Sequence, residues 1–236
     1  MQIMRSVVGA TLIGAAAFSG SAFAGATGNV GAVSEYMFRG ISQGTGAAVQ
    51  GGVDYASDSG FYLGLWGSNI DWGPGSVETD VYGGFAGKAG DIGYDVGAIY
   101  YYYPEEDETN TDPSVNTIEA YFGLTFGPVG IKAYYSPKYF GAEDGGGDDV
   151  DEIYLSGTAA FPLSDSLNLT AGLGYTTLGE KIITDGSKLT DDYIDYSVGL
   201  AKTIDGGFTA SFAVIGTDLK DDDPKFVIGL KKSFDL

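Results

Sequence analysis

The chain contains no cysteine and no histidine, and only 12 of its 236 residues are lysine or arginine. Without cysteine it can form no disulfide scaffold, no thiol nucleophile and no cysteine-ligated zinc site. Without histidine it has no imidazole base, no Ser-His-Asp triad and no histidine-ligated metal. Its 32 acidic residues give a formal net charge of −20, which would repel a nucleic acid. The sequence therefore excludes the common histidine- and cysteine-dependent enzymes and argues against nucleic-acid binding.

Long apolar segments are absent as well. Arg5 is the only charged residue in positions 1–24, and the apolar stretch 7–18 is shorter than the ~20 residues that a membrane-spanning helix needs. The segment 21–24, Ser-Ala-Phe-Ala, then provides the small residues of a cleavage site. We therefore predict that residues 1–24 are a cleaved secretory signal peptide. Since no cysteine follows this site, we expect no lipid anchor on the exported chain.

Glycine and tyrosine are abundant, and apolar and polar side chains alternate with a period of two. In residues 92–102, for example, Ile92, Tyr94 and Val96 alternate with glycine and aspartate, which indicates a strand with two different faces. Most such segments have about the 9–11 residues with which a tilted strand crosses a bilayer. We predict twelve strands, at 29–39, 47–57, 61–69, 77–86, 92–102, 118–126, 130–136, 153–161, 167–175, 194–204, 208–214 and 226–236.

Short and long connections alternate between these strands. The short ones are 57–60, 87–90, 127–130, 162–166 and 205–207, and the long ones are 40–46, 69–76, 103–115, 137–151, 178–191 and 218–224. Transmembrane β-barrels have this arrangement because their periplasmic turns are tight and their extracellular loops are long. We therefore predict an all-β fold, an antiparallel up-and-down transmembrane β-barrel that forms a single domain over residues 25–236. An even number of strands places both ends of the barrel on the periplasmic side.

Nine acidic residues fall within the predicted strands, and all nine lie on the face opposite to the apolar one. A carboxylate that faces lipid is energetically costly, so this parity assigns the acidic face to the lumen. Lys202 and Lys232 have the outward parity, near strand ends from which a lysine side chain can reach the interface. We predict the pore-lining residues to be Glu35, Arg39, Asp54, Glu78, Asp80, Asp95, Glu119, Lys132, Tyr134, Glu152 and Asp195, and Asp235 is the ninth acidic residue of the set.

Aromatic residues cluster near the ends of the predicted strands. Amphipathic rings favour the border between water and lipid, so we expect two aromatic girdles around the barrel. The loop-side group comprises Tyr36, Phe38, residues 100–103, Tyr134, Tyr135 and Tyr139. The turn-side group comprises Phe61, Phe85, Phe126, Phe161, Phe208 and Phe234.

Four segments carry a resemblance to a known family: SEYMFRGISQ at 34–43, GGVDYASDSGFYLGLWGSNIDW at 51–72, DIGYDVGAIYYYYP at 91–104 and AYYSPKYFG at 133–141. They resemble the TorF-type porins of the proteobacterial outer membrane. The resemblance implies an outer-membrane barrel of about twelve strands and a porin function, but no particular solute. The last residue is Leu236, with Phe234 two positions earlier, whereas this class usually ends in the aromatic residue that the barrel-assembly machinery recognises.

A twelve-strand barrel with strands ~4.8 Å apart and tilted by ~40° has a backbone radius of about 12 Å, which suits small solutes. We expect passive diffusion of small hydrophilic solutes with a weak preference for cations, no cofactor, and contacts with outer-membrane lipid and lipopolysaccharide. The inward basic residues are Arg39, Lys132, Lys225 and Lys231, and the four segments 103–115, 137–151, 178–192 and 218–225 hold 18 of the 32 acidic residues. Arg39 shares a face with Glu35, so an Arg39–Glu35 pair is one possibility and a free arginine in the pore is the other.

Other functions are open at this stage. The chief alternative is a plugged structural or adhesin-type outer-membrane barrel that uses its acidic extracellular loops, and a third is a secreted β-sandwich lectin. A hydrolase that pairs Glu78 with Asp80 is chemically conceivable, but carboxylates are ordinary in a porin lumen. The acidic stretches 105–112, 143–151 and 221–223 are expected to be solvated loops, and 143–152, although rich in oxygen ligands, lacks the spacing of a calcium loop. We therefore predict neither an enzyme nor a metal site.

Overall fold

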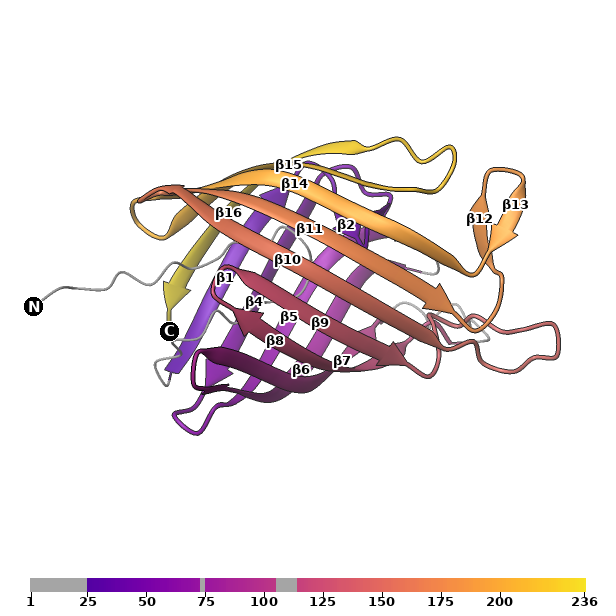
Figure 1. Cartoon of the computed structure of the whole chain (residues 1–236), viewed down its shortest axis with the longest axis horizontal. Coiled ribbons are helices and arrows are strands. Elements are labelled where there is room, and N and C mark those ends of the chain that lie inside the picture. The colour runs from indigo at the N-terminus through magenta and orange to yellow at the C-terminus, as the bar shows by residue number, and fades with distance from the viewer. Residues whose placement is uncertain (1–24, 73–74, 105–113) are drawn as a thin grey trace, which may run out of the picture.

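The computed structural model describes residues 25–72, 75–104 and 114–236. Twelve antiparallel strands close into a barrel, as predicted, in which β1 pairs with both β4 and β16 (Figure 1). The described residues include no helix long and apolar enough to cross a membrane. The barrel strands are β1 (Gly25–Val33), β4 (Ala48–Ala56), β5 (Phe61–Trp72), β6 (Gly75–Ala89), β7 (Ile92–Tyr102), β8 (Thr117–Phe126), β9 (Val129–Ser136), β10 (Glu152–Ser164), β11 (Leu167–Leu178), β14 (Asp192–Ile204), β15 (Phe208–Thr217) and β16 (Lys225–Asp235).

The two faces of the barrel wall differ as the alternation predicts. On β8, for example, Ile118 and Phe122 are each 51% exposed on the outside, whereas Glu119 and Tyr121 are buried inside. The same parity places seven acidic side chains of the wall in the interior. Glu78, Asp80, Glu119, Glu152 and Asp195 are buried there, and Asp54 and Asp95 are partly buried. Asp235 is exposed at the end of β16.

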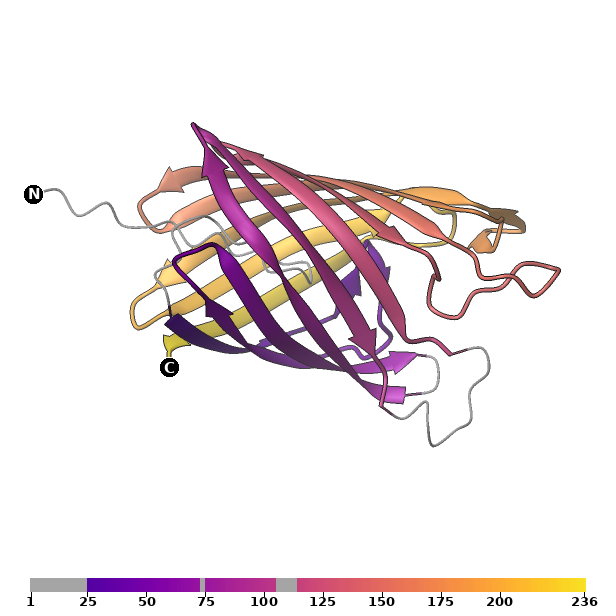
Figure 2. The ribbon, with the colours of Figure 1, turned by 90° about the horizontal axis from the view of Figure 1, so that it is seen from below.

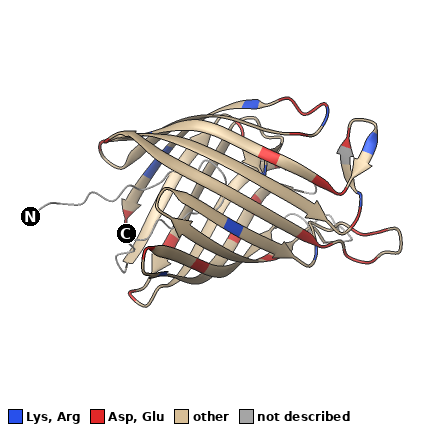
Figure 3. Cartoon of the chain, viewed as in Figure 1, with Lys and Arg blue, Asp and Glu red and all other residues tan. Residues whose placement is uncertain are grey.

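The connections separate the two ends of the barrel. Tight turns lie at the end where β1 begins and β16 ends, and the long connections lie at the opposite end (Figures 1 and 2). Two small hairpins, β2–β3 and β12–β13, belong to the long connections: β2 (Met37–Phe38), β3 (Ile41–Ser42), β12 (Ile183–Asp185) and β13 (Lys188–Thr190). Acidic residues are frequent in the connections at this far end (Figure 3).

Two predicted connections are wrong in detail. The connection at 69–76 is short, because β5 continues to Trp72 and β6 begins at Gly75, with a register shift between Asn69 and Trp72. The first strand ends at Val33 and not at residue 39. Residues 34–47 then leave the wall and form the β2–β3 hairpin, so alternation in this segment does not reflect a lipid-facing strand.

The turn-side aromatic girdle agrees with the structure, and the loop-side girdle does so only in part. The six turn-side phenylalanines are all exposed on the outer surface. On the loop side Tyr100 and Tyr135 are exposed, but Tyr36, Tyr101, Tyr103 and Tyr134 are buried inside the barrel. Strand parity, and not proximity to a strand end, decides on which side of the wall a ring lies.

Candidate functional site

The β2–β3 hairpin is built on a two-residue turn. Met37 pairs with Ser42 and Phe38 with Ile41, so Arg39 and Gly40 form the turn, with φ values of 48° and 79°. Positive φ at both central positions is the mark of a type I′ turn, which glycine and asparagine adopt readily. For arginine the left-handed region costs on the order of 1 kcal/mol. The strained residue of this hairpin is therefore also the one that carries its positive charge.

Gly40 is the residue that lets the turn approach the wall. A Cβ added at this position would lie 2.7 Å from Asp195 Cβ and 2.7 Å from Thr217 Cγ2. These distances are shorter than any real van der Waals contact, so a side chain would push the hairpin away from β14 and β15. Glycine thus satisfies both the backbone conformation and the limited space.

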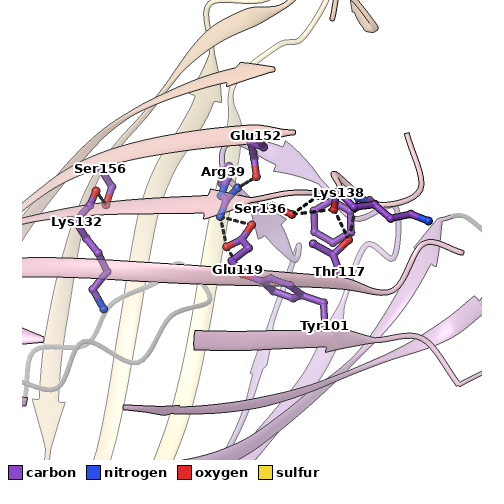
Figure 4. A network of polar contacts seen from close by, with 10 residues as sticks. Arg39, Tyr101, Thr117, Glu119, Lys132, Ser136, Lys138, Glu152 and Ser156 are labelled. Atoms are coloured by element: carbon purple, nitrogen blue, oxygen red, sulfur yellow. Dashed lines mark hydrogen bonds and ion pairs between the residues drawn. The ribbon is translucent and has the colours of Figure 1, made fainter. Parts of the chain in front are cut away.

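The Arg39 guanidinium is held by two carboxylates of the opposite wall. Nη2 donates to Glu119 Oε1 and Oε2 at 2.8 and 2.7 Å, and Nη1 donates to Glu152 Oε2 at 2.5 Å (Figure 4). Arg39 is 3% exposed, Glu119 0% and Glu152 1%. Glu119 lies on β8 and Glu152 on β10, and each of these strands is five positions from β1 around the ring. The hairpin therefore reaches from β1 across the lumen.

Aromatic rings complete the surroundings of Arg39. Its guanidinium carbon lies 4.2 Å from the ring centre of Tyr154, 4.7 Å from Phe38 and 5.3 Å from Tyr134. These distances fall within the range of a cation–π interaction. The Tyr101 hydroxyl donates to Glu119 Oε2 at 3.2 Å. We call the group of Glu119, Glu152, Tyr134 and Tyr154, which all belong to the barrel wall, the guanidinium pocket.

Apolar and polar contacts anchor the rest of the hairpin. Met37 packs with Ala213, Ile215 and Val227 on β15 and β16, and all four residues are buried. The Tyr36 hydroxyl donates to Glu78 Oε1 at 2.8 Å.

Two aromatic contacts extend these anchors to further strands. The Tyr36 ring lies 5.6 Å from that of Trp66 on β5, and Phe38 packs edge-on against Tyr101 on β7. With the Arg39 and Gly40 contacts, the segment touches strands on all sides of the ring, so it constricts the lumen at this level.

Several buried acceptors in the lumen have no donor. Asp80 Oδ1, Glu152 Oε1 and Asp195 Oδ2 are buried without a hydrogen-bond partner among the described residues. Glu78, by contrast, accepts bonds from the hydroxyls of Tyr36 and Tyr103 at 2.8 and 3.1 Å. Glu152 and Asp195 each accept a hydrogen bond at the other oxygen, from Arg39 and from the Tyr154 hydroxyl at 3.4 Å, so one acceptor position of each carboxylate stays unused inside the barrel.

A second ion pair lies in the lumen beside the guanidinium pocket, with Lys132 Nζ 5.8 Å from the ring centre of Tyr134. Lys132 Nζ is 2.6 Å from Asp95 Oδ2, and both side chains remain partly exposed. The Tyr62 hydroxyl donates to Asp95 Oδ1 at 2.6 Å, and the Tyr82 hydroxyl donates to Asp54. The predicted residues Asp54, Asp95 and Lys132 are therefore partly exposed inside the wall.

The structure corrects the pairing of Arg39. Glu35 was a possible partner because residues 29–39 were expected to form one strand, but this strand ends earlier. Glu35 is partly buried and accepts a hydrogen bond from the Ser42 hydroxyl, while Arg39 pairs with Glu119 and Glu152.

One signal for the inward hairpin exists in the sequence: Ile215 and Val227 are apolar at positions whose parity faces the lumen. They require an apolar cover, and Met37 provides it.

The acidic connections show no metal-binding arrangement where the structure describes them. The Asp144 carboxylate accepts the backbone N–H groups of Asp148 and Gly146, and these bonds lower the pKa of Asp144 below its usual value. Among the described residues no group of three or more acidic side chains is placed to hold a metal ion. The predicted signal peptide, residues 1–24, and the acidic residues 105–112 lie outside the described part of the chain.

Comparison with solved structures identifies the class of fold. The chain is similar to the KdgM porin, with a TM-score of 0.57 at 13% identity over 88% of this chain and 99% of that one. It is also similar to the NanC porin, with a TM-score of 0.59 at 11% identity over 89% of this chain and 100% of that one. At these identities the likeness concerns the fold, which is a porin-like barrel.

The family assignment comes from a sequence model. The chain belongs to the Gcw_chp family, described as a bacterial protein of unknown function, whose model matches residues 16–233. A search of curated proteins gave no match. These findings agree with the porin-like barrel that the sequence resemblance implied, and the narrower TorF-type assignment stays a prediction.

Proposed function

We propose that this protein is a porin-like channel of the bacterial outer membrane through which small hydrophilic solutes diffuse passively. The observation that carries the proposal is the two-sided wall. Large apolar side chains cover the outside of the closed ring, where only lipid can solvate them without cost, and charged side chains occupy the inside. A surface of this kind would aggregate in water. Outer-membrane lipid, lipopolysaccharide and the barrel-assembly machinery are the partners that such a barrel requires.

The charge of the lumen favours cations. Seven carboxylates of the barrel strands face the interior, against Lys132, Lys225, Lys231 and the hairpin residue Arg39. The acidic long connections add to this potential and would concentrate cations at the pore mouth. One structural neighbour is KdgM in complex with a disordered oligogalacturonate, which is a polyanion. Because the excess charge here is negative, we do not extend that class of solute to this chain.

The hairpin sets the size of the solute in this proposal. Residues 36–42 contact the wall on several sides at one level, so the space left for diffusion is narrower than the barrel itself. Small inorganic and organic cations are therefore the expected solutes. No catalytic step and no cofactor are part of the proposal.

Planar-bilayer recordings of the purified barrel test the proposal. We expect discrete conductance steps and, across a KCl gradient, a reversal potential with the sign of cation preference. A reversal potential of the opposite sign would contradict the cation preference. Sugars and amino acids added to one side then report which neutral solutes enter.

A plugged barrel is the second candidate, and the contacts of the hairpin with so many strands favour it. A variant in which residues 36–43 are replaced by a short glycine-serine link separates the two functions. If the native barrel conducts and the variant conducts more, the hairpin constricts an open channel. If the native barrel is silent and only the variant conducts, the protein is a plugged barrel. Silence of both folded proteins would end the channel proposal.

A further inference from the structure

We propose that the guanidinium pocket is a binding site for the cationic group of a solute, a guanidinium or a primary ammonium, and that Arg39 is its tethered occupant. This inference deepens the proposed function, on which its relevance to transport rests. The binding site itself can be tested without any measurement of transport.

The pocket belongs to the wall and does not depend on the hairpin. Glu119 is part of β8, Tyr134 of β9, and Glu152 and Tyr154 of β10, three consecutive strands in which β9 pairs with both β8 and β10. The side chains come from a continuous, hydrogen-bonded sheet, which would keep them close together without Arg39. Of the groups that touch the guanidinium, only Phe38 comes from the hairpin.

The acceptors of the pocket fit a cation, and one of them is unused. Arg39 occupies Glu119 Oε1 and Oε2 and one oxygen of Glu152. Glu152 Oε1 is buried and has no hydrogen-bond partner among the described residues. Two buried carboxylates and two tyrosine rings on one patch of wall suit an organic cation, and guanidinium fits better than a primary ammonium because it donates to carboxylates in a planar fork and also stacks on rings.

If the pocket served only to hold the hairpin in place, it would not need two carboxylates and two tyrosine rings. Two carboxylates in a buried site are unfavourable unless a cation neutralises them, and apolar residues of similar size would hold a hairpin at least as well. The cation that neutralises them is Arg39, whose φ of 48° lies in the left-handed region that arginine rarely adopts. The arrangement resembles a receptor site in which a segment of the chain takes the place of the ligand.

Free guanidinium is the probe of choice, applied to an Arg39→Gly variant. Glycine suits the positive φ of the turn, so the variant removes the tethered cation and keeps the hairpin geometry. Calorimetric titration of the folded variant in detergent, with millimolar guanidinium chloride and with KCl of equal strength as reference, measures the site. We expect saturable guanidinium binding that is at least about tenfold tighter in Arg39→Gly than in the native protein. Equal, non-saturating heats in both proteins would overturn the proposal.

Two control variants make the result specific. Lys132→Ala also removes one inward cation but leaves Arg39 in its pocket, so it should bind guanidinium no better than the native protein. Arg39→Gly combined with Glu119→Gln removes one carboxylate of the pocket and should lose most of the gained binding. If the double variant binds as tightly as Arg39→Gly, guanidinium occupies some other site and the proposal is wrong.

A second variant guards against a folding failure. If Arg39→Gly does not fold, Arg39→Asn keeps a residue that the turn favours and also removes the charge. Its thermal midpoint should rise with millimolar guanidinium relative to KCl, whereas that of the native protein should not. If guanidinium raises the two midpoints equally, or raises neither, the proposal is contradicted. Binding by a variant of a barrel that never conducts would support the pocket and reject only the transport function.

Discussion

At the residue scale, Arg39 neutralises two buried carboxylates and should therefore contribute to the stability of the barrel. Replacement by glycine leaves Glu119 and Glu152 as buried carboxylates without a cation, and breaking a buried ion pair in this way costs about 3–5 kcal/mol. We expect Arg39→Gly to unfold at a clearly lower temperature, measured as the loss of the compact, fast-migrating species on a heat-modifiability gel. Lys132→Ala disrupts a partly exposed pair and should cost about 1 kcal/mol or less. Equal midpoints for the native protein and Arg39→Gly would show that the pair contributes no stability.

Gly40 permits a second test at the residue scale, with a matched control in the same segment. Gly40 and Gly46 both have positive φ, at 79° and 60°, but a Cβ at Gly46 would meet no atom within 4 Å. Gly46→Ala should therefore show only the backbone cost, about 1 kcal/mol. Gly40→Ala adds a clash with Asp195 and Thr217 and should cost on the order of 1–3 kcal/mol more. Urea unfolding followed by tryptophan fluorescence measures both, and similar losses would mean that the hairpin does not press against β14 and β15.

At the scale of elements, the barrel strands could be predicted from alternation, whereas the hairpin left only an indirect signal, the inward parity of Ile215 and Val227. Lipid on one side and charged groups on the other impose a period of two that any single strand reveals, as in β8, where Ile118 and Glu119 face opposite sides. The hairpin obeys no such rule, because its partners come from strands far away in the sequence. Arg39 lies 80 residues from Glu119 and 113 from Glu152. Spacing within residues 29–39 therefore suggested the wrong partner, Glu35.

The apolar contact between Met37 of the hairpin and the barrel wall gives the prediction at the scale of elements. Met37→Ala removes the side chain that covers Ala213, Ile215 and Val227, and truncation of a buried methionine typically costs 2–5 kcal/mol. We expect Met37→Ala to lower the free energy of unfolding by about 2 kcal/mol at most, because a hairpin can relax into the vacated space more easily than a core strand. Leu189→Ala, on the exposed β13 strand outside the barrel ring, should change stability by no more than ~0.5 kcal/mol. Denaturant midpoints of the two variants provide the comparison. A Met37 variant as stable as the Leu189 variant would show that the contact does not anchor the hairpin.

At the scale of the whole molecule, the proposed channel has two sets of acidic groups that would act on an approaching ion over different ranges. Glu78 and Asp80 lie buried in the lumen, whereas Asp221 and Asp223 are exposed in the connection before β16. Exposed charges are screened over about 10 Å at 0.1 M salt and over about 3 Å at 1 M. Buried charges are screened much less, so the two sets can be distinguished by ionic strength.

Paired charge-removing variants use this difference. Glu78→Gln with Asp80→Asn should lower the ratio of cation to anion permeability at both dilute and molar KCl, because in the proposed channel these buried carboxylates lie inside the wall, where salt screens them less. Asp221→Asn with Asp223→Asn should lower the ratio in dilute KCl and have almost no effect in molar KCl. Reversal potentials of the two variants and the native barrel, each at two mean salt concentrations, measure the effect. If the lumen variant also regains native selectivity in molar salt, ions do not pass close to Glu78 and Asp80, and selectivity arises at the pore mouth.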